Sequence, residues 1–332
     1  MGFTVAIAGV TGAVGTEMLK VLERRDFPVD ELRPLASARS AGKTVPFKGE
    51  AVTVQELTED SFAGVDVALF SAGGSISKRF RQACIDAGCL MVDNSSAFRM
   101  DPEVPLVVPE VNPDDVGAHK GVIANPNCTT IIMLTALAPL HRAVPLRRIV
   151  AATYQAASGA GQQAMLELEA ETRAVLAGEQ FERTVIPVPY AFNFFPHNSP
   201  YGDEGYCEEE MKMVNESRKM LHAPDLRVHA TCVRVPVLRA HGEALNVEFA
   251  GELSVERAYE LLAAAPGVRV VEDRATNRWG MPVDVSGQDD VLVGRIRRDP
   301  SAENTLDLWV VGDQLLKGAA LNAVQVAELA CR

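Results

Sequence analysis

Short apolar runs and helix-like segments alternate along the first 125 residues or so of the chain. Apolar runs with the length of buried strands occupy Phe3–Ala8, Arg33–Ser37, Val65–Ser71 and Leu90–Asp93. Helix-like segments follow the first and third of these runs, at Thr16–Arg25 and Ile76–Ala87. Strands that alternate with helices are typical of parallel sheets, so this pattern predicts a doubly wound α/β domain.

Strand-like segments dominate the second half of the chain. They are Arg148–Tyr154, Leu226–Leu238, Ala244–Leu253, Val268–Val271, Val291–Arg297 and Leu306–Val311. Few helices interrupt them, chiefly Gln162–Leu176, Glu208–Met220 and Val255–Ala265. This pattern predicts an α+β domain with a mostly antiparallel sheet and helices on one side. We place the first domain at residues 1–127 and the second at residues 128–312. We expect the last helix, Asp313–Cys331, and with it residues 313–332, to pack back on the first domain.

A run without charged residues extends from Gly121 to Leu140 and contains NPNCTTIIMLTALAPL. A membrane span is one reading of its length, but Asn125, Pro126 and Asn127 suit a hydrocarbon core poorly, and the strongly apolar part is too short. Turn residues followed by good helix material favour a helix buried in a protein core. Cys128 then lies at the helix N-terminus, where unpaired N–H groups and the helix dipole favour a thiolate. The alternative is that Cys128 is a small apolar core residue, as most unpaired cysteines are.

A glycine-rich turn, GVTGAVG, joins the first predicted strand to the first predicted helix. Strand, glycine turn and helix form the context that a dinucleotide-binding motif requires. Gly9 permits the tight turn, Gly12 lets the backbone approach a pyrophosphate, and Gly15 allows the helix to pack closely on the strand. The spacing is GxxGxxG rather than GxGxxG, and a glycine turn without a ligand remains the alternative.

The end of the second predicted strand indicates which nicotinamide cofactor binds. An NAD site usually has an acidic residue there for the ribose 2′-hydroxyl, whereas this chain reads LASARSAGK from Leu35 to Lys43. Ser37, Arg39 and Ser40 suit a 2′-phosphate, which favours NADP. A solvated surface loop would also contain such residues.

Charge and cysteine content exclude several classes of function. The chain has 332 residues and a net charge of −12 without a basic run, which argues against a nucleic-acid partner. Its six cysteines follow no zinc spacing and are sparse for a disulfide framework, so we expect no metal site and a reducing, cytoplasmic environment. We also expect no membrane attachment, because the uncharged run does not suit a membrane span.

Several motifs together resemble bacterial aspartate-semialdehyde dehydrogenases. They are NSSAFR at 94–99, Asn127-Cys128, YQAASGAG at 154–161, RVPVLRAH at 234–241 and EEMK at 209–212, beside GVTGAVG and ASARS. The resemblance extends to GDQLLKGAALNAVQ near the C-terminus and so covers essentially the whole chain. It implies a Rossmann-type dinucleotide-binding domain and a catalytic and dimerisation domain. The implied reaction is the NADPH-dependent reductive dephosphorylation of L-4-aspartyl phosphate to aspartate semialdehyde, on the route to lysine, threonine and methionine.

The resemblance also assigns roles to individual residues. It implies that Cys128 is the nucleophile, His241 the acid/base catalyst and Gln155 an orienting residue. The implied substrate-binding residues comprise two phosphate ligands, a residue beside the acyl group, an ammonium acceptor and a carboxylate clamp, namely Arg99 and Lys212, Asn127, Glu209 and Arg234. The implied cofactor-binding residues are Gly9, Thr11, Gly12, Ala13, Val14, Gly15, Ser37, Arg39, Ser40, Ser71, Gly73, Ser158, Gly159 and Gln314.

Two placements within this set follow from spacing. Glu209 and Lys212 are three residues apart and share a face if the segment is helical. Arg234 and His241 are seven apart, which in one regular strand would put them on opposite faces, unless Pro236 and the turn at 240–242 break the strand. Other histidines, including His119 and His197, are interpreted as structural or surface residues.

One segment departs from the family pattern, and three rival functions remain. Residues 193–202 read NFFPHNSPYG, where the family form is closer to NVIPHID, and we attach no function to them. N-acetyl-glutamyl-phosphate reductase is the nearest rival enzyme, although its nucleophile motif usually reads Gly-Cys-Tyr. Glyceraldehyde-3-phosphate dehydrogenase, whose core is usually Ser-Cys-Thr-Thr, is more distant, and a non-catalytic paralogue would be expected to lose Cys128 or His241. Family resemblance suggests a homodimer or a dimer of dimers.

Overall fold

The computed structural model describes residues 2–331, which form two compact units. The first unit contains the chain up to Asn127 and again from Gly318 onward, and the second contains Cys128 to Lys317. Each unit has its own main sheet.

The first unit is built on a six-stranded parallel sheet with the order β5-β2-β1-β6-β7-β8. Its strands are β1 (Phe3–Ala8), β2 (Val29–Ala36), β5 (Gln55–Glu56), β6 (Val67–Phe70), β7 (Leu90–Asp93) and β8 (Val122–Ala124). Its helices are α1 (Ala13–Arg24), α2 (Gly74–Asp86) and α8 (Leu321–Ala330), with 3₁₀ turns at Glu59–Phe62 and Pro113–Ala118. The predicted doubly wound domain is therefore confirmed, and a hairpin that the sequence did not predict, β3 (Thr44–Phe47) and β4 (Glu50–Thr53), is added to it.

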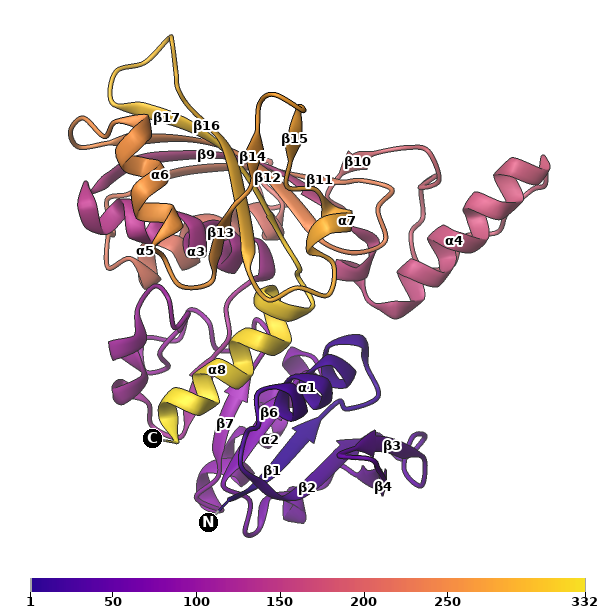
Figure 1. The fold of residues 1–332 in the computed structure, drawn as a ribbon. Coiled ribbons are helices and arrows are strands. Elements are labelled where there is room, and N and C mark those ends of the chain that lie inside the picture. Colours follow the sequence, from indigo (N-terminus) through magenta and orange to yellow (C-terminus); the bar gives the residue numbers. More distant parts are fainter. Residues whose placement is uncertain (1, 332) are drawn as a thin grey trace. The chain divides into compact units, whose positions relative to one another are not determined.

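The second unit is built on a seven-stranded mixed sheet with the order β10-β11-β9-β12-β17-β16-β13 (Figure 1). Its strands are β9 (Leu146–Gln155), β10 (Phe195–Pro196), β11 (Arg227–Arg234), β12 (His241–Phe249), β13 (Val268–Val270), β16 (Val291–Arg298) and β17 (Thr305–Gly312), with a small hairpin of β14 (Glu272–Asp273) and β15 (Arg278–Trp279). Most neighbouring strands are antiparallel, as predicted, but β11 runs parallel to β9 and β13 parallel to β16.

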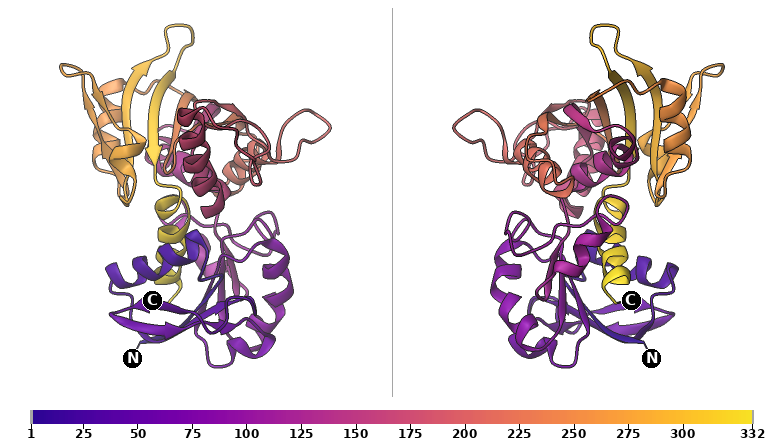
Figure 2. Two further views of the ribbon diagram at one scale, coloured as in Figure 1. Left: turned by 90° about the vertical axis from the view of Figure 1, so that its right-hand side faces the viewer. Right: turned by 90° about the vertical axis from the view of Figure 1, so that its left-hand side faces the viewer.

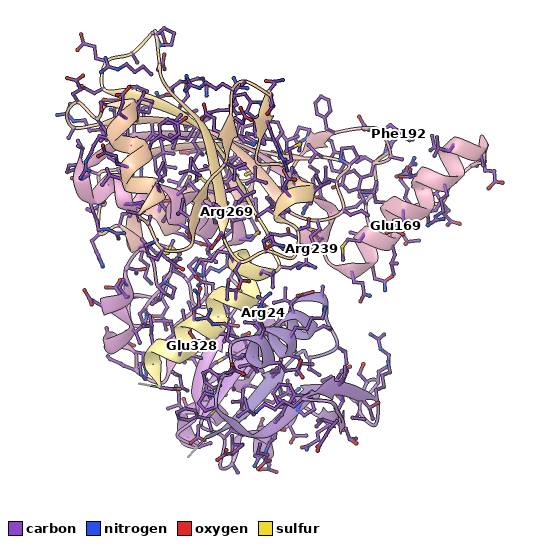
Figure 3. All side chains as sticks on the ribbon, in the orientation of Figure 1. Arg24, Glu169, Phe192, Arg239, Arg269 and Glu328 are labelled. Carbon is purple, nitrogen blue, oxygen red and sulfur yellow. The ribbon has the colours of Figure 1, made fainter. Side chains whose placement is uncertain are left out.

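Helices pack on this sheet because their apolar residues contact the apolar side chains that alternate along the strands. They are α3 (Cys128–Ala143), α5 (Glu208–Met220) and α6 (Val255–Ala263), and a short helix, α7 (Pro282–Val285), lies near β17. A further helix, α4 (Gln162–Ala177), projects from the unit in Figure 1 and lies in front of it in the left view of Figure 2. Figure 3 shows Glu169 on α4 and Phe192 in the segment that returns from it.

Helix α3 explains the uncharged run at residues 121–140. Its residues from Thr129 to Ala138 are all buried, so the run is a core helix, as predicted. Pro139 lies inside the helix, which continues to Ala143. No helix in the described part of the chain combines the length and apolarity that spanning a membrane requires.

Several predicted elements are wrong in extent. The strands expected at Arg33–Ser37 and Ala244–Leu253 begin earlier, at Val29 and His241. The strand expected at Leu226–Leu238 ends at Arg234, and Pro236 cannot donate to a further ladder bond. The helix expected from Asp313 to Cys331 begins later, with a π-helical turn at Leu316–Ala320 before α8. The Asp313 carboxylate accepts bonds from Arg239 and from the Leu315 amide, which fixes this stretch in a non-helical turn.

Candidate active site

Cys128 is the first residue of α3, directly after Asn127. The residue is partly exposed, as is Cys331, while Cys84, Cys89, Cys207 and Cys232 are all buried. The first-turn N–H groups of a helix lack intrahelical acceptors, so a group at this position has backbone donors beside it. This combination of access and donors suits a nucleophile better than a packing residue.

Three predicted site residues form one row across neighbouring strands of the second unit. Arg234 at the end of β11 is paired with Gln155 at the end of β9. His241 begins β12, which runs antiparallel to β9 with Gly242 opposite Tyr154. Arg234 and His241 therefore lie on different strands, on either side of β9. Their spacing of seven residues thus does not put them on opposite faces of one strand. A Cβ placed on Gly159 would lie 3.2 Å from both Arg234 Nη1 and His241 Nε2, so the two side chains border one point.

The His241 imidazole is fully buried and held in one orientation. Its Nδ1 accepts a hydrogen bond from the Ala156 amide at 3.0 Å, which assigns the proton of the neutral ring to Nε2. Within the described residues, Nε2 has no hydrogen-bond partner. Burial, and then the positive charge of Arg234, lower the pKa of His241 to about 3. A bound anion beside Arg234 would offset that charge and raise the pKa toward the range useful for proton transfer.

The polypeptide before His241 is held by a small network. Ala240 has a φ of 74°, in the left-handed region that a residue with a Cβ seldom adopts. Its amide donates to Gln314 Oε1 at 2.8 Å, and Gln314 Nε2 donates to the Ser158 hydroxyl. Ser158, Gly159 and Gln314 thus lie in the second unit, around the turn that holds the imidazole.

Gln155, Glu209 and Lys212 form a connected polar group. Gln155 is buried, and its Nε2 donates to Glu209 Oε1 at 3.1 Å while its Oε1 accepts from the Thr153 hydroxyl at 3.0 Å. Glu209 lies in the first turn of α5 and pairs with Lys212 Nζ at 3.1 Å, so the predicted shared helix face is present. Both signs of charge are therefore available beside the row of Arg234, Gln155 and His241, which we call the catalytic row.

Arg234 is buried and hydrogen-bonded to neutral groups. Its Nε donates to Asn198 Oδ1 at 3.2 Å, and its Nη1 donates to the Ala156 carbonyl at 3.3 Å. Neighbouring His197 is also buried, and burial together with Arg234 lowers the pKa of His197 to about 4. His197 is thus a buried residue and not a surface one, and the segment that carries it reaches the site, which the sequence did not indicate.

Arg99 and Asn127 belong to the first unit. Arg99 is buried. Its Nε donates a hydrogen bond to the Asn125 carbonyl at 2.9 Å, and its Nη2 donates to the Asn94 carbonyl at 3.0 Å. These bonds tie it to the segments that end β7 and β8. The structure therefore distributes the predicted substrate residues over both units.

A cleft of about 450 Å³ in the first unit contains much of the predicted nucleotide site. The predicted residues that line it are Gly9, Thr11, Gly12, Ser37 and Ser71. Gly12 is the N-cap of α1, which places the Ala13 and Val14 amides in the first turn of that helix. Gly73 plays the same part for α2.

Two of the glycines have steric roles at this cleft. Gly9 has a φ of 86°, and a Cβ there would lie 2.4 Å from the Ser71 carbonyl oxygen. Gly15 lies against the Gly9 carbonyl, where a Cβ would be 2.3 Å away, so it permits close packing of α1 on the turn.

The cation at the cleft differs in part from the one predicted. Arg39 and Ser40 follow the lining residue Ala38 but are not themselves among the lining residues, and Ser40 is buried. Arg79 on α2, with its guanidinium 4.9 Å from the Phe80 ring centroid, lines the cleft and was not predicted. Only its place in the second helical segment could have indicated it.

Comparison with known proteins is consistent with this geometry. The family models described as the NAD binding domain and the dimerisation domain of semialdehyde dehydrogenase match residues 4–119 and 137–317. The chain is 59% identical to the aspartate-semialdehyde dehydrogenase of Synechocystis sp. over 325 residues, which cover 98% of this chain and 96% of that protein. It is 49% identical to the Bacillus subtilis protein of the same name, over 98% and 97% of the two chains.

A solved structure agrees with the fold in detail. The crystal structure of aspartate semialdehyde dehydrogenase II of Vibrio cholerae complexed with ASA superposes with a TM-score of 0.97 at 45% identity, covering 100% of this chain and 99% of that one. Sequence and fold therefore agree over nearly the full length, and the chain belongs to the aspartate-semialdehyde dehydrogenase family.

Proposed function

We propose that the protein catalyses the NADPH-dependent reductive dephosphorylation of L-4-aspartyl phosphate to L-aspartate 4-semialdehyde and phosphate. The observation that carries this proposal is the partly exposed Cys128 at the start of α3, in a chain that also provides a buried row of Arg234, Gln155 and His241. The family relationship supports the same reaction.

Cys128 forms the covalent intermediate. Its thiolate attacks the acyl carbon of aspartyl phosphate, phosphate leaves, and a thioester remains on the sulfur. The amides of the first turn of α3 donate to the oxyanion that develops during this attack. NADPH, when bound, supplies the hydride that reduces the thioester.

His241 handles the proton of the reduction step. Its Nε2 has no hydrogen-bond partner among residues 2–331, so it is available to the oxygen of the reacting carbonyl group. Release of the aldehyde returns the thiolate, and the imidazole exchanges the proton that the tetrahedral oxygen takes up and loses. Gln155 orients the substrate beside this ring through its fixed bonds to Thr153 and Glu209.

The charges on the substrate match the charges of the proposed ligands. Arg234 binds the α-carboxylate, and Glu209 binds the α-ammonium. Arg99 and Lys212 bind the phosphate, and Asn127 lies beside the acyl group. The net charge of −12 makes such a local group of cations necessary for an anionic substrate.

NADP binds along the glycine turn of the first unit. The α1 N-terminus at Gly12 suits the pyrophosphate, and the segment from Ser37 to Ser40 suits the 2′-phosphate. Ser158, Gly159 and Gln314 are the proposed contacts from the second unit.

A homodimer is the proposed assembly. The sheet face of the second unit that carries Tyr154 and Trp309 leaves Tyr154 39% exposed, with its ring centroid 5.8 Å from that of Trp309. An aromatic pair of this kind, in the region matched by a dimerisation-domain model, suits an interface between copies. We place the enzyme in the cytoplasm, where the reduced cysteines expected from the sequence would persist.

One assay tests this function. The protein is mixed with L-aspartate 4-semialdehyde, phosphate and NADP⁺, and absorbance of the reduced cofactor is followed. Phosphate-dependent reduction of NADP⁺ is expected, with no comparable rate on N-acetyl-glutamate 5-semialdehyde. A protein that used the acetylated substrate instead would be the rival reductase, and one that used neither would not be this enzyme.

A further inference from the structure

Residues 197–199 follow the edge strand β10 and contact the proposed substrate-binding residues Arg234 and Glu209. They lie outside the motifs that carry the family resemblance. β10 pairs with the end of β11, where Phe195 lies opposite Arg234. The His197 amide then donates to the Cys232 carbonyl at 2.8 Å, which continues the attachment one residue further. Backbone bonds to β11 therefore fix where the next two side chains lie.

Asn198 determines how Arg234 presents its guanidinium. The amide oxygen of Asn198 accepts from Nε at 3.2 Å, and the Ala156 carbonyl accepts from Nη1 at 3.3 Å. A guanidinium has five N–H donors, so three remain, all on the two terminal nitrogens. The terminal edge of the fork is thus the one directed at a ligand, which is the edge that binds a carboxylate end-on in a bidentate pair.

The neutrality of Asn198 matters as much as its position. Arg234 is 5% exposed, and no carboxylate in the described part of the chain accepts a hydrogen bond from it. Buried charges are usually paired, so a guanidinium held only by neutral groups retains its attraction for an anionic ligand. An acidic residue at position 198 would hold the same geometry and cancel that attraction.

Ser199 supports Glu209, the residue proposed to bind the α-ammonium group of the substrate. Its hydroxyl oxygen accepts from the Glu209 amide at 3.2 Å, at the start of α5. The Ser199 hydroxyl also lies 3.0 Å from Nδ1 of His197, which accepts from the Ser199 amide at 3.2 Å. The buried His197 therefore anchors Ser199, and Ser199 anchors the turn of α5 that carries Glu209.

We propose that His197, Asn198 and Ser199 form the support of the amino-acid recognition site, with Asn198 positioning Arg234 for the α-carboxylate and Ser199 positioning Glu209 for the α-ammonium. This inference rests on the substrate roles proposed above for Arg234 and Glu209. It assigns a role in substrate recognition to a segment whose sequence departs from the family form.

Steady-state kinetics in the phosphorylating direction test this proposal with four variants of the full-length protein. Asn198→Leu removes the acceptor and should raise the KM for aspartate semialdehyde about 3- to 10-fold, the scale of one hydrogen bond. Asn198→Asp keeps the acceptor and neutralises Arg234, so its KM should rise about 10- to 100-fold. In both variants kcat should stay within about threefold, as expected when binding alone is weakened. Asn193→Asp is the matched control, since the side-chain amide of Asn193 bonds only to the Pro189 carbonyl within the described part of the chain, and its KM should stay within about twofold.

Two further measurements separate positioning from a general structural effect. The KM for phosphate should change less than the KM for the aldehyde in Asn198→Leu, because phosphate binds elsewhere. Succinate semialdehyde, which has the carboxylate but no ammonium, serves as a competitor. Asn198→Leu should weaken its inhibition, while Ser199→Ala should weaken binding of aspartate semialdehyde and leave this inhibition within about twofold.

The outcomes distinguish this inference from the proposed function. A wild-type protein without activity on aspartate semialdehyde would remove the proposed function itself. An active wild type with unchanged KM in both Asn198 variants would overturn the inference alone. Equal increases in KM for aldehyde and phosphate in Asn198→Leu would also overturn it, because they would indicate disturbed folding of the segment.

Discussion

Gly159 determines how closely a backbone turn approaches the catalytic row. It lies in the turn Ala157–Ala160, and a Cβ added to it would be 3.2 Å from Arg234 Nη1 and from both Cε1 and Nε2 of His241. These separations are shorter than ordinary van der Waals contact by a few tenths of an ångström. Gly159→Ala should therefore displace the guanidinium, the imidazole or both.

The size of the effect follows from how firmly both groups are held. The imidazole is fixed by its bond from the Ala156 amide at 3.0 Å, and Arg234 by Asn198 and the Ala156 carbonyl. A misplacement of about 1 Å can cost about 10²-fold in rate, so a few tenths should lower kcat/KM about 5- to 20-fold. A Gly→Ala change also stabilises by about 0.4–1 kcal/mol through the unfolded chain, which offsets the overlap. The free energy of unfolding should accordingly change by less than about 1 kcal/mol.

The assay measures kcat and KM for aspartate semialdehyde, phosphate and NADP⁺, together with urea unfolding. Gly117→Ala is the control, because no atom of the residues that the structure describes lies within 4 Å of a Cβ at Gly117. We expect Gly159→Ala to raise the KM for the aldehyde and lower kcat, and Gly117→Ala to do neither. Wild-type kinetics in Gly159→Ala would refute the reasoning, and so would an increase confined to the KM for NADP⁺, which would mean that the methyl group meets the cofactor instead.

Three other changes test separate parts of the account. His241→Asn should lower kcat by about 10²–10⁴-fold, the scale of a lost general acid/base, and near-normal turnover across the pH range would return His241 to a structural role. Arg39→Ala should weaken NADPH binding about 10- to 150-fold with little effect on NADH, as expected for a lost charge-assisted bond to the 2′-phosphate, and an equal loss for both cofactors would contradict that contact. Glu243 is buried without hydrogen-bond partners for its carboxylate oxygens among the described residues, and burial raises its pKa well above the usual value, so the folded state keeps a proton that the unfolded chain loses. Its contribution to stability is therefore present at acid pH and is lost as pH rises. The loss is about 1.4 kcal/mol per pH unit between the pKa of Glu243 in the unfolded chain and its higher pKa in the folded protein, and Glu243→Gln should remove that dependence in unfolding titrations. An unchanged pH profile in Glu243→Gln would mean that Glu243 does not titrate in this way.

Local sequence signals predicted the elements that carry the site. β1, β7 and α5 were predicted with the bounds that the structure has, since each is a continuous apolar run or a helical segment of clear composition. The turn of Asn125 to Asn127 before α3 placed Cys128 at a helix N-terminus for the same reason. Such features depend on residues close together in the sequence.

Features that depend on distant residues could not be predicted in this way. Asn198 acquires its role from Arg234, 36 residues later, and the pairing arises only when β10 joins β11. The non-helical stretch at Asp313 likewise depends on Arg239, 74 residues earlier. The left-handed backbone of Ala240 has no glycine to signal it, and it persists because Gln314 holds the amide.

The central claim is that Cys128 carries the acyl group, and trapping that intermediate tests it most directly. Mixing the enzyme with aspartate semialdehyde and NADP⁺ in the absence of phosphate should oxidise a thiohemiacetal at Cys128 to a thioester and stop there, because no acyl acceptor follows. The account predicts a burst of reduced cofactor of one equivalent per active site, with an aspartyl group found by peptide mass spectrometry on Cys128. Cys128→Ser should give neither burst nor adduct. An adduct on Cys84, Cys89, Cys207, Cys232 or Cys331, or a full burst in Cys128→Ser, would contradict the account.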